Sequence, residues 1–302
     1  MYFNRAQAKQ AARESIRRTR PSCLTVMALY VLLTTGVEWL LTAVMGSNLS
    51  EQFLLYIQQG YDPAEVFRYL LERNGQEKIA LFSCVQFVQS IYTLLVAFGL
   101  TSYTLRVARN ENPGPGHLLD GFLKAGRVLW MGLLIGIFSL GWYLVIFVPL
   151  VGAALLMEYN DLALDILAGL MVIGAFVVIA AILRYILADY FLLDDPACTA
   201  REAIRRSKAA MKGHRWEYVV LELSFMGWAL LISLASGLAA MALPALGTVV
   251  SAVAALWYTP YVMVTKANFY DCISASILGE RTSGDYAGPN YDYHASEGPE
   301  PF

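Results

Sequence analysis

Charged side chains are scarce in this chain of 302 residues. Asp, Glu, Lys and Arg make up 15% of it, whereas soluble domains carry roughly 25%. Hydrophobic residues make up 57%, and they are gathered into long blocks instead of the single apolar stripe of a surface helix. The shortage of charge and the blocks together exclude an ordinary soluble domain and indicate an integral membrane protein.

Cysteine and histidine are also few, with four and three residues. Cys23, Cys198 and Cys272 fall near the cytoplasmic face predicted below, whereas Cys84 falls alone near the outer face, so no disulfide is expected within a monomer. The histidines are His117, His214 and His294, which are too scattered for a metal site. The chain also lacks a nucleotide-binding loop and a Ser/His/Asp order. We therefore expect no metal, no cofactor and no enzymatic activity.

Six apolar blocks are each long enough to cross the roughly 30 Å hydrocarbon core of a bilayer as a helix. They are residues 23–45, 79–105, 128–157, 162–193, 216–241 and 248–271. Their content of Ala, Leu and Gly and the absence of ten-residue alternation favour helices over a β-barrel. The sequence thus predicts an all-α polytopic bundle of six transmembrane helices, which forms one membrane domain over residues 1–278.

The basic residues indicate how this bundle is oriented. They cluster before the first block, between the second and third, and between the fourth and fifth: Arg5, Lys9, Arg13, Arg17, Arg18 and Arg20; Arg106, Arg109, Lys124 and Arg127; Arg201, Arg205, Arg206, Lys208, Lys212 and Arg215. Only Arg68, Arg73 and Lys78 lie in the opposite loops. The positive-inside rule therefore predicts that both termini are cytoplasmic. The first block is long for the apolar part of a signal peptide, so we expect it to be retained as a span.

The chain repeats one of its segments. Residues 12–20 read ARESIRRTR and residues 200–208 read AREAIRRSK, which are identical at six of nine positions, and each segment precedes an apolar block. We interpret the chain as three copies of one plan, a basic amphipathic helix followed by a span out and a span back. The first copy begins with a helix over residues 4–20, and the middle copy is reduced to a short segment over residues 117–127. The third begins after Asp195, a predicted N-cap, and Pro196.

The basic helices of the first and third copies are candidate contacts for lipid headgroups. The cations concerned are Arg13, Arg17, Arg18, Arg201, Arg205, Arg206, Lys208 and Lys212. In one interpretation they form a cytoplasmic surface for anionic lipid or for a partner membrane protein. In the other they are interfacial anchors that only orient the spans. Because each basic segment adjoins a span, no nucleic-acid partner is expected.

Two segments lie outside the predicted spans. The loop over residues 46–77 has two amphipathic stretches; Asp62 and Pro63 form a helix start, and Asn74 and Gly75 form a stop signal. We therefore expect a helical hairpin on the outer side. The segment over residues 279–302 is rich in Gly, Pro, Ser and acidic residues and is expected to be a disordered cytoplasmic tail.

A few charges fall inside the apolar blocks, and three of them form a candidate intramembrane polar site. Glu222 lies about 9 Å along the helix past Trp216, where a carboxylate is costly unless it is paired or hydrated. Arg184 falls in the same leaflet with Asp189 nearby, so the sequence predicts an Arg184–Glu222 pair. Such a pair is either a proton or substrate-headgroup site, or a clamp between two helices.

Residues 200–228 carry a resemblance to a known family. They read AREAIRRSKAAMKGHRWEYVVLELSFMGW, which resembles the signature of an uncharacterised bacterial integral membrane family, Domain of Unknown Function 975. The matching residues are Ser207, Lys208, Met211, Lys212, Gly213, His214, Trp216, Leu221, Glu222, Leu223, Ser224, Phe225, Gly227 and Trp228. The similarity covers most of residues 1–275, and the long outer loop and Tyr-rich tail depart from it. The bundle is more remotely similar to the membrane domain attached to some glycerophosphodiester phosphodiesterases, whose catalytic barrel this chain lacks.

The resemblance implies a bacterial plasma-membrane protein of six spans, and it assigns no activity. We expect a non-enzymatic membrane module that binds lipid or a partner protein and supports envelope or transport functions. The alternative is a small transporter or lipid-translocating protein that uses Glu222 and Arg184. A third hypothesis, an enzyme acting on lipid, requires Glu222, Asp189 and His214 to converge in one pocket.

Overall fold

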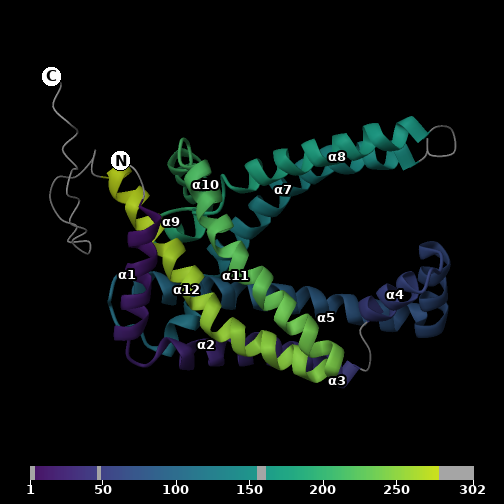
Figure 1. Cartoon of the computed structure of the whole chain (residues 1–302), viewed down its shortest axis with the longest axis horizontal. Coiled ribbons are helices and arrows are strands. Elements are labelled where there is room, and N and C mark those ends of the chain that lie inside the picture. The colour runs from purple at the N-terminus through teal and green to yellow at the C-terminus, as the bar shows by residue number, and fades with distance from the viewer. Residues whose placement is uncertain (1–3, 46–48, 155–160, 279–302) are drawn as a thin grey trace.

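The computed structural model describes residues 4–45, 49–154 and 161–278, and within these residues the chain is helical and has no strand (Figure 1). The prediction of an all-α protein is therefore confirmed. The predicted tail over residues 279–302 lies outside the described residues.

The first basic helix forms where the sequence predicts it. Helix α1 spans Arg5–Arg18, and the side-chain oxygen of Asn4 accepts hydrogen bonds from the backbone N–H groups of Ala6 and Gln7. This is the N-cap arrangement that satisfies the free donors of a first helical turn. Ala8, Ala12 and Ser15 are buried on one face of α1, and this face packs along α12 (Pro244–Leu278).

Within the described residues, the first two apolar blocks and the loop between them form five helical segments. Helix α2 spans Cys23–Val31, a π-helical segment η1 spans Leu32–Gly36, and α3 spans Val37–Met45. Helix α4 spans Leu49–Gln58, and α5 spans Pro63–Ala108 with Asp62 as its N-cap. The outer hairpin thus consists of α4 and the first turns of α5, where the ring of Tyr56 meets the ring of Tyr69 at 5.8 Å between centroids. The predicted stop at Asn74 and Gly75 is wrong, because α5 continues through both residues.

The part of the chain that follows α5 contains short helical segments and a break in one of the predicted spans. A 3-10 segment η2 spans Pro115–Leu119, and α6 spans Asp120–Leu123; they are followed by α7 (Ala125–Ala154), α8 (Asp161–Ile182) and α9 (Ala188–Asp194). The predicted block over residues 162–193 is therefore broken by a turn after Ile182. The Ser207 hydroxyl donates to the carbonyl of Arg184 at 2.8 Å and accepts from the N–H of Leu187 at 3.2 Å. These bonds satisfy backbone groups that the break leaves without helical partners.

The second basic helix begins later than the sequence predicts. Helix α10 spans Ala200–Ala210, and its N-cap is Thr199, whose hydroxyl accepts from the N–H of Glu202. The predicted cap, Asp195, instead accepts from the N–H of Ala197 and forms a local turn. Helix α11 spans Arg215–Ala242 and packs against α12 along their length.

Two glycines allow the η2–α6 segment to lie directly on α5. A Cβ atom added to Gly99 would stand 1.9 Å from the carbonyl oxygen of Leu118, and one added to Gly121 would stand 2.0 Å from the carbonyl oxygen of Leu95. Each segment therefore places a glycine against the backbone of the other, and no side chain fits at either position.

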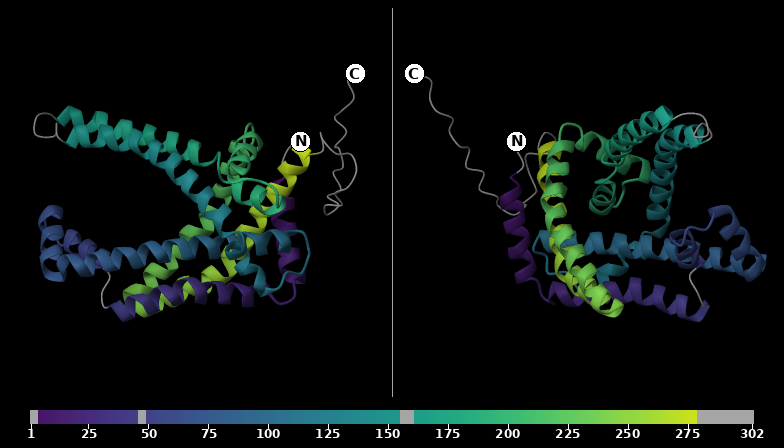
Figure 2. Two further views of the ribbon diagram at one scale, coloured as in Figure 1. Left: turned by 180° about the vertical axis from the view of Figure 1, so that it is seen from behind. Right: turned by 45° about the vertical axis from the view of Figure 1, so that its right-hand side comes forward.

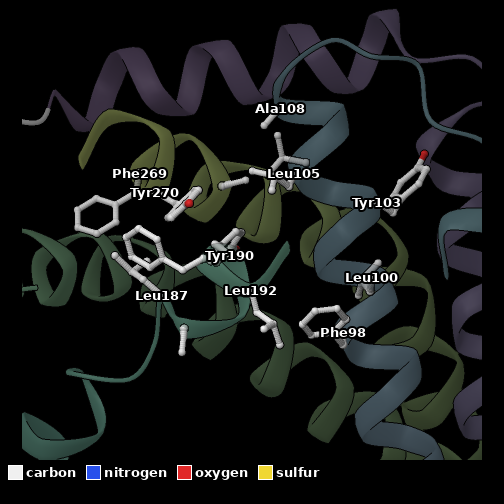
Figure 3. Close-up of a cluster of buried hydrophobic side chains, with 14 of the residues drawn as sticks. Phe98, Leu100, Tyr103, Leu105, Ala108, Leu187, Tyr190, Leu192, Phe269 and Tyr270 are labelled. Carbon is white, nitrogen blue, oxygen red and sulfur yellow. The ribbon is translucent and has the colours of Figure 1, made fainter. Parts of the chain in front are cut away.

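The buried core lies at one end of the molecule. Figure 3 shows Phe98 of α5 beside Leu192, and Leu105 of α5 on the side of Tyr270 of α12; Leu187, Tyr190 and Phe269 belong to the same cluster. The α7–α8 hairpin extends away from this core, and so do the parts of α5, α11 and α12 that are farthest from it (Figures 1 and 2). The extended parts carry many exposed large apolar side chains, which is the pattern of surfaces that face lipid.

Four helical stretches in the described residues are long and apolar enough to cross a membrane: Cys23–Leu41, Ala80–Ala108, Ala125–Val145 and Arg215–Ala242. A shorter apolar helix covers Met171–Ile182. These stretches coincide with the first, second, third and fifth predicted blocks.

Candidate functional site

Glu222 has partners, but the predicted partner is wrong. It lies on α11 and forms an ion pair with Lys266 of α12, with 2.7 Å between Oε1 and Nζ. The Tyr218 hydroxyl, one turn earlier on α11, donates to the same carboxylate at 2.5 Å. Both members of the ion pair are half-buried. The carboxylate is thus satisfied between two packed helices, as the clamp interpretation requires.

Arg184 lies in the turn between α8 and α9, where the predicted span is broken. Its Nε atom is buried and has no hydrogen-bond partner among the described residues. Within the described part of the chain, no hydrogen bond or ion pair joins Arg184 to Glu222 or to Asp189. The structure therefore does not assemble the three predicted residues into one bonded site.

Asp189 lies in the first turn of α9 beside the buried ring of Tyr190. Burial raises the pKa of its carboxyl to about 6, because desolvation penalises the charged form. Tyr190 in turn stacks on Tyr270 of α12, with 5.0 Å between ring centroids. Asp189 is therefore next in sequence to a residue that joins α9 to α12.

Arg109 lies at the centre of a cluster of bonded side chains that the sequence analysis did not predict. Arg109, which follows α5, forms two hydrogen bonds to Asp194 at the end of α9, at 2.7 and 2.9 Å. It also reaches Asp271 of α12 at 2.6 Å, and the Tyr270 hydroxyl donates to Asp194 at 2.6 Å. We call these four residues the Arg109 hub. One feature of the sequence could have indicated this cluster: Arg109, Asp194 and Asp271 each lie at the predicted cytoplasmic end of the second span of a pair.

Several of the predicted headgroup cations are already neutralised by carboxylates. Arg205 and Arg206 both bind Glu202, at 2.7 and 3.0 Å, and Arg206 also binds Asp195 at 3.1 Å. Hydrogen bonds from Arg205 and Arg206 lower the pKa of the Glu202 carboxyl. Arg18 lies 3.7 Å from Glu14 on α1. These arginines carry less net charge toward a membrane surface than the sequence suggests.

The remaining predicted headgroup cations are exposed on α1 and near α10, and the structure gives them no carboxylate partner in the described residues: Arg13, Arg17, Arg201, Lys208 and Lys212. Two of them lie over aromatic rings. Arg13 is 5.2 Å from the ring centroid of Tyr261, and Lys208 is 4.9 Å from that of Phe138. Lys9 of α1 likewise lies 4.3 Å from the ring of Phe225. Cations above aromatic rings are typical of the boundary between bilayer and water.

Among the described residues, no group of three or more His, Cys, Asp and Glu residues is arranged to hold a metal ion. His214 contacts Glu217 at 2.8 Å, one turn into α11. Cys23 and Cys198 are buried thiols, and Cys84 is an exposed thiol.

Comparison of the sequence with known proteins gives a match to one protein family. A family model described as "Protein of unknown function (DUF975)" matches residues 1–276. No curated protein and no solved structure matches the chain. The match covers every described helix from α1 through most of α12.

Proposed function

We propose, from the premise that this chain belongs to the DUF975 family, that it is a non-enzymatic module of the bacterial plasma membrane. In this proposal six helices span the membrane, both termini are cytoplasmic, and the basic segments bind anionic lipid headgroups at the cytoplasmic face. Its role is to support envelope or transport functions through lipid or a partner membrane protein.

Two further helices support the count of six spans. Helix α8 has 22 residues and is therefore about 33 Å long at the rise of an α-helix, which matches the hydrocarbon core. It packs against α7, a candidate span. Helix α12 has 35 residues and packs against α11. Each is thus the return arm of a hairpin whose first arm is long and apolar enough to cross.

The packing of the basic segments supports three repeats. The η2–α6 segment packs on α5, the last helix of the first copy, and α10 packs on α9, the last helix of the second copy. Helix α1 packs on α12, the last helix of the third copy. Each basic segment therefore joins its own copy to the end of another one, and α1 closes the series into a ring.

The observation that carries the lipid-binding proposal is the set of exposed cations on α1 and near α10 that have no carboxylate partner in the described residues. A cation near an anionic membrane surface contributes about 1 kcal/mol, whereas one that is already bound to a carboxylate contributes less. Of the predicted contacts, Arg201 and Lys212 are exposed and lack a carboxylate in the described residues. They are therefore the residues on which the proposal is tested.

The test is the lipid selectivity of the reconstituted protein. Spin-labelled phosphatidylglycerol and phosphatidylcholine report which lipid the protein retains at its surface, at low and high salt. We expect the wild type to prefer phosphatidylglycerol, and R201Q/K212Q to lose much of this preference and of its salt dependence. The matched control is R68Q/R73Q, which removes two exposed cations from α5 on the predicted outer side. Equal selectivity in all three proteins would instead support helices that only anchor the spans.

A further inference from the structure

A cation and an aromatic pair meet where the α7–α8 hairpin joins the core. The Lys208 ammonium of α10 lies 4.9 Å from the ring centroid of Phe138 on α7 and 5.2 Å from that of Tyr185, which follows α8. The two rings are stacked, with 6.0 Å between centroids and 11° between planes. This contact joins three elements, and α10 packs against both α7 and α9 around it (Figure 2).

Arg184 stands beside the same contact. It precedes Tyr185 in the chain, and its carbonyl accepts a 2.8 Å hydrogen bond from Ser207, the neighbour of Lys208. Arg184 and Tyr185 of the turn are therefore held against Ser207 and Lys208 of α10. Ser207 is fully buried, so this attachment fixes the backbone positions from which Arg184 and Lys208 extend.

The two cations lack compensating charge. Neither Arg184 nor Lys208 has an ion pair in the described part of the chain, and the buried Nε atom of Arg184 has no hydrogen-bond partner there. A charge that is partly removed from water and has no counter-charge costs free energy. Arg184 is half-buried, so an anion bound at its guanidinium would supply the missing counter-charge. A phosphate group suits this role because it accepts several charge-assisted hydrogen bonds at once.

The surroundings favour a phosphate that carries acyl chains. Phe138 lies within the candidate span Ala125–Val145 and is 40% exposed. Ile137 of the same helix is 55% exposed. A headgroup phosphate held by the two cations would thus place its glycerol and acyl chains against apolar side chains that already face the bilayer.

We propose that Arg184 and Lys208, with the Phe138–Tyr185 pair, form a specific site for the phosphate of one anionic phospholipid in the cytoplasmic leaflet. This inference rests on the proposed function and deepens it: the exposed cations Arg201 and Lys212 provide a general preference for anionic lipid, and this site retains a single molecule. It also gives Arg184 a role that the predicted pair with Glu222 does not.

The experiment is native mass spectrometry of the full chain in detergent, titrated with phosphatidylglycerol or phosphatidylcholine. For the wild type we expect the first phosphatidylglycerol to bind about tenfold more tightly than later ones, since a charge-assisted contact is worth about that factor. K208Q and R184Q should each lose this first tight event, and K208R should retain it. In R184Q/K208Q the loss should be smaller than the product of the two single losses, because both cations bind one phosphate.

Control variants separate this site from the general preference. R201Q/K212Q should keep the first tight event and weaken only the later ones. If K208Q and R184Q both bind the first lipid as the wild type does, the site is refuted and the general preference stands. If the wild type binds both lipids equally, the proposed function is refuted together with the site. Displacement of the lipid by millimolar inorganic phosphate would show a site for free phosphate and overturn the assignment to lipid. K208Q alters an exposed side chain, so its result decides the matter even if R184Q unfolds.

Discussion

At the scale of single residues, the ion pair between Glu222 and Lys266 separates the clamp interpretation from the transporter alternative. Replacing Glu222 with Gln leaves Lys266 without its partner between two packed helices. We expect E222Q to reduce the free energy of unfolding by about 1–2 kcal/mol, less than for a fully buried pair because both side chains are half-buried. Unfolding in detergent, followed by circular dichroism, measures this loss.

A double variant tests the same ion pair more directly. E222Q/K266Q should recover part of the lost stability, because it removes the unpaired charge. The control is E14Q/R18Q, which removes an exposed Glu–Arg pair of 3.7 Å on α1 and should change stability by less than about 0.5 kcal/mol. If E222Q is as stable as the wild type and abolishes a proton-dependent uptake, the transporter alternative replaces the clamp.

At the scale of elements, the contact of the η2–α6 segment with α5 depends on two glycines. G99A or G121A would drive a methyl group into a backbone carbonyl of the other segment, so the segments must separate. We expect each variant to lose about 3 kcal/mol or more, at the upper end of overpacking effects, and to show a lowered melting temperature. G136A is the matched control within α7, because an added Cβ meets no atom within 4 Å there, and it should be neutral or stabilising. Unchanged melting of G99A and G121A would contradict the close approach.

The differences between predicted and observed helix limits have physical causes. Asn74 and Gly75 do not end α5, because a glycine costs only about 1 kcal/mol inside a helix. The rest of this helix, which has 46 residues in total, outweighs that cost. The break after Ile182 depends on Ser207, which is 20 residues or more distant in sequence from the groups that it satisfies. Local patterns predict two helix starts, at Asn4 and Asp62, and misplace a third, because the N-cap of α10 is Thr199 and not Asp195. They also miss ends that tertiary contacts decide.

Candidate site residues could be predicted as costly charges, but their partners could not. The apolar block around Glu222 showed that this carboxylate needs a partner, and the structure supplies one. Choosing Lys266 over Arg184 required knowing which side chains meet where α11 packs on α12, and the apolar pattern of the two blocks does not contain this. The Arg109 hub was missed for the same reason. Arg109, Asp194 and Asp271 are distant in sequence and meet only because the ends of α5 and α9 lie against α12 near Asp271.

At the scale of the whole molecule, the proposed ring of three copies predicts how the chain crosses the membrane. If each copy is a basic segment followed by a span out and a span back, every basic segment and the Arg109 hub lie on one side, and the α4–α5 hairpin lies on the other. The four candidate spans alone do not establish this arrangement, because it needs α8 and α12 to cross as well.

Cysteine labelling tests that arrangement. In a chain whose four native cysteines are replaced, Ser50→Cys on α4 should react with a membrane-impermeant maleimide in intact cells. Ser283→Cys, which lies beyond the described residues, should react only after the membrane is opened, because the positive-inside rule places it in the cytoplasm. Arg201→Cys, just inside α10, should behave like Ser283→Cys, since both follow an even number of crossings. Labelling of positions 50 and 283 from the same side would refute the six-span arrangement, and labelling of position 201 from outside would show that α7 and α8 do not form a complete out-and-back pair.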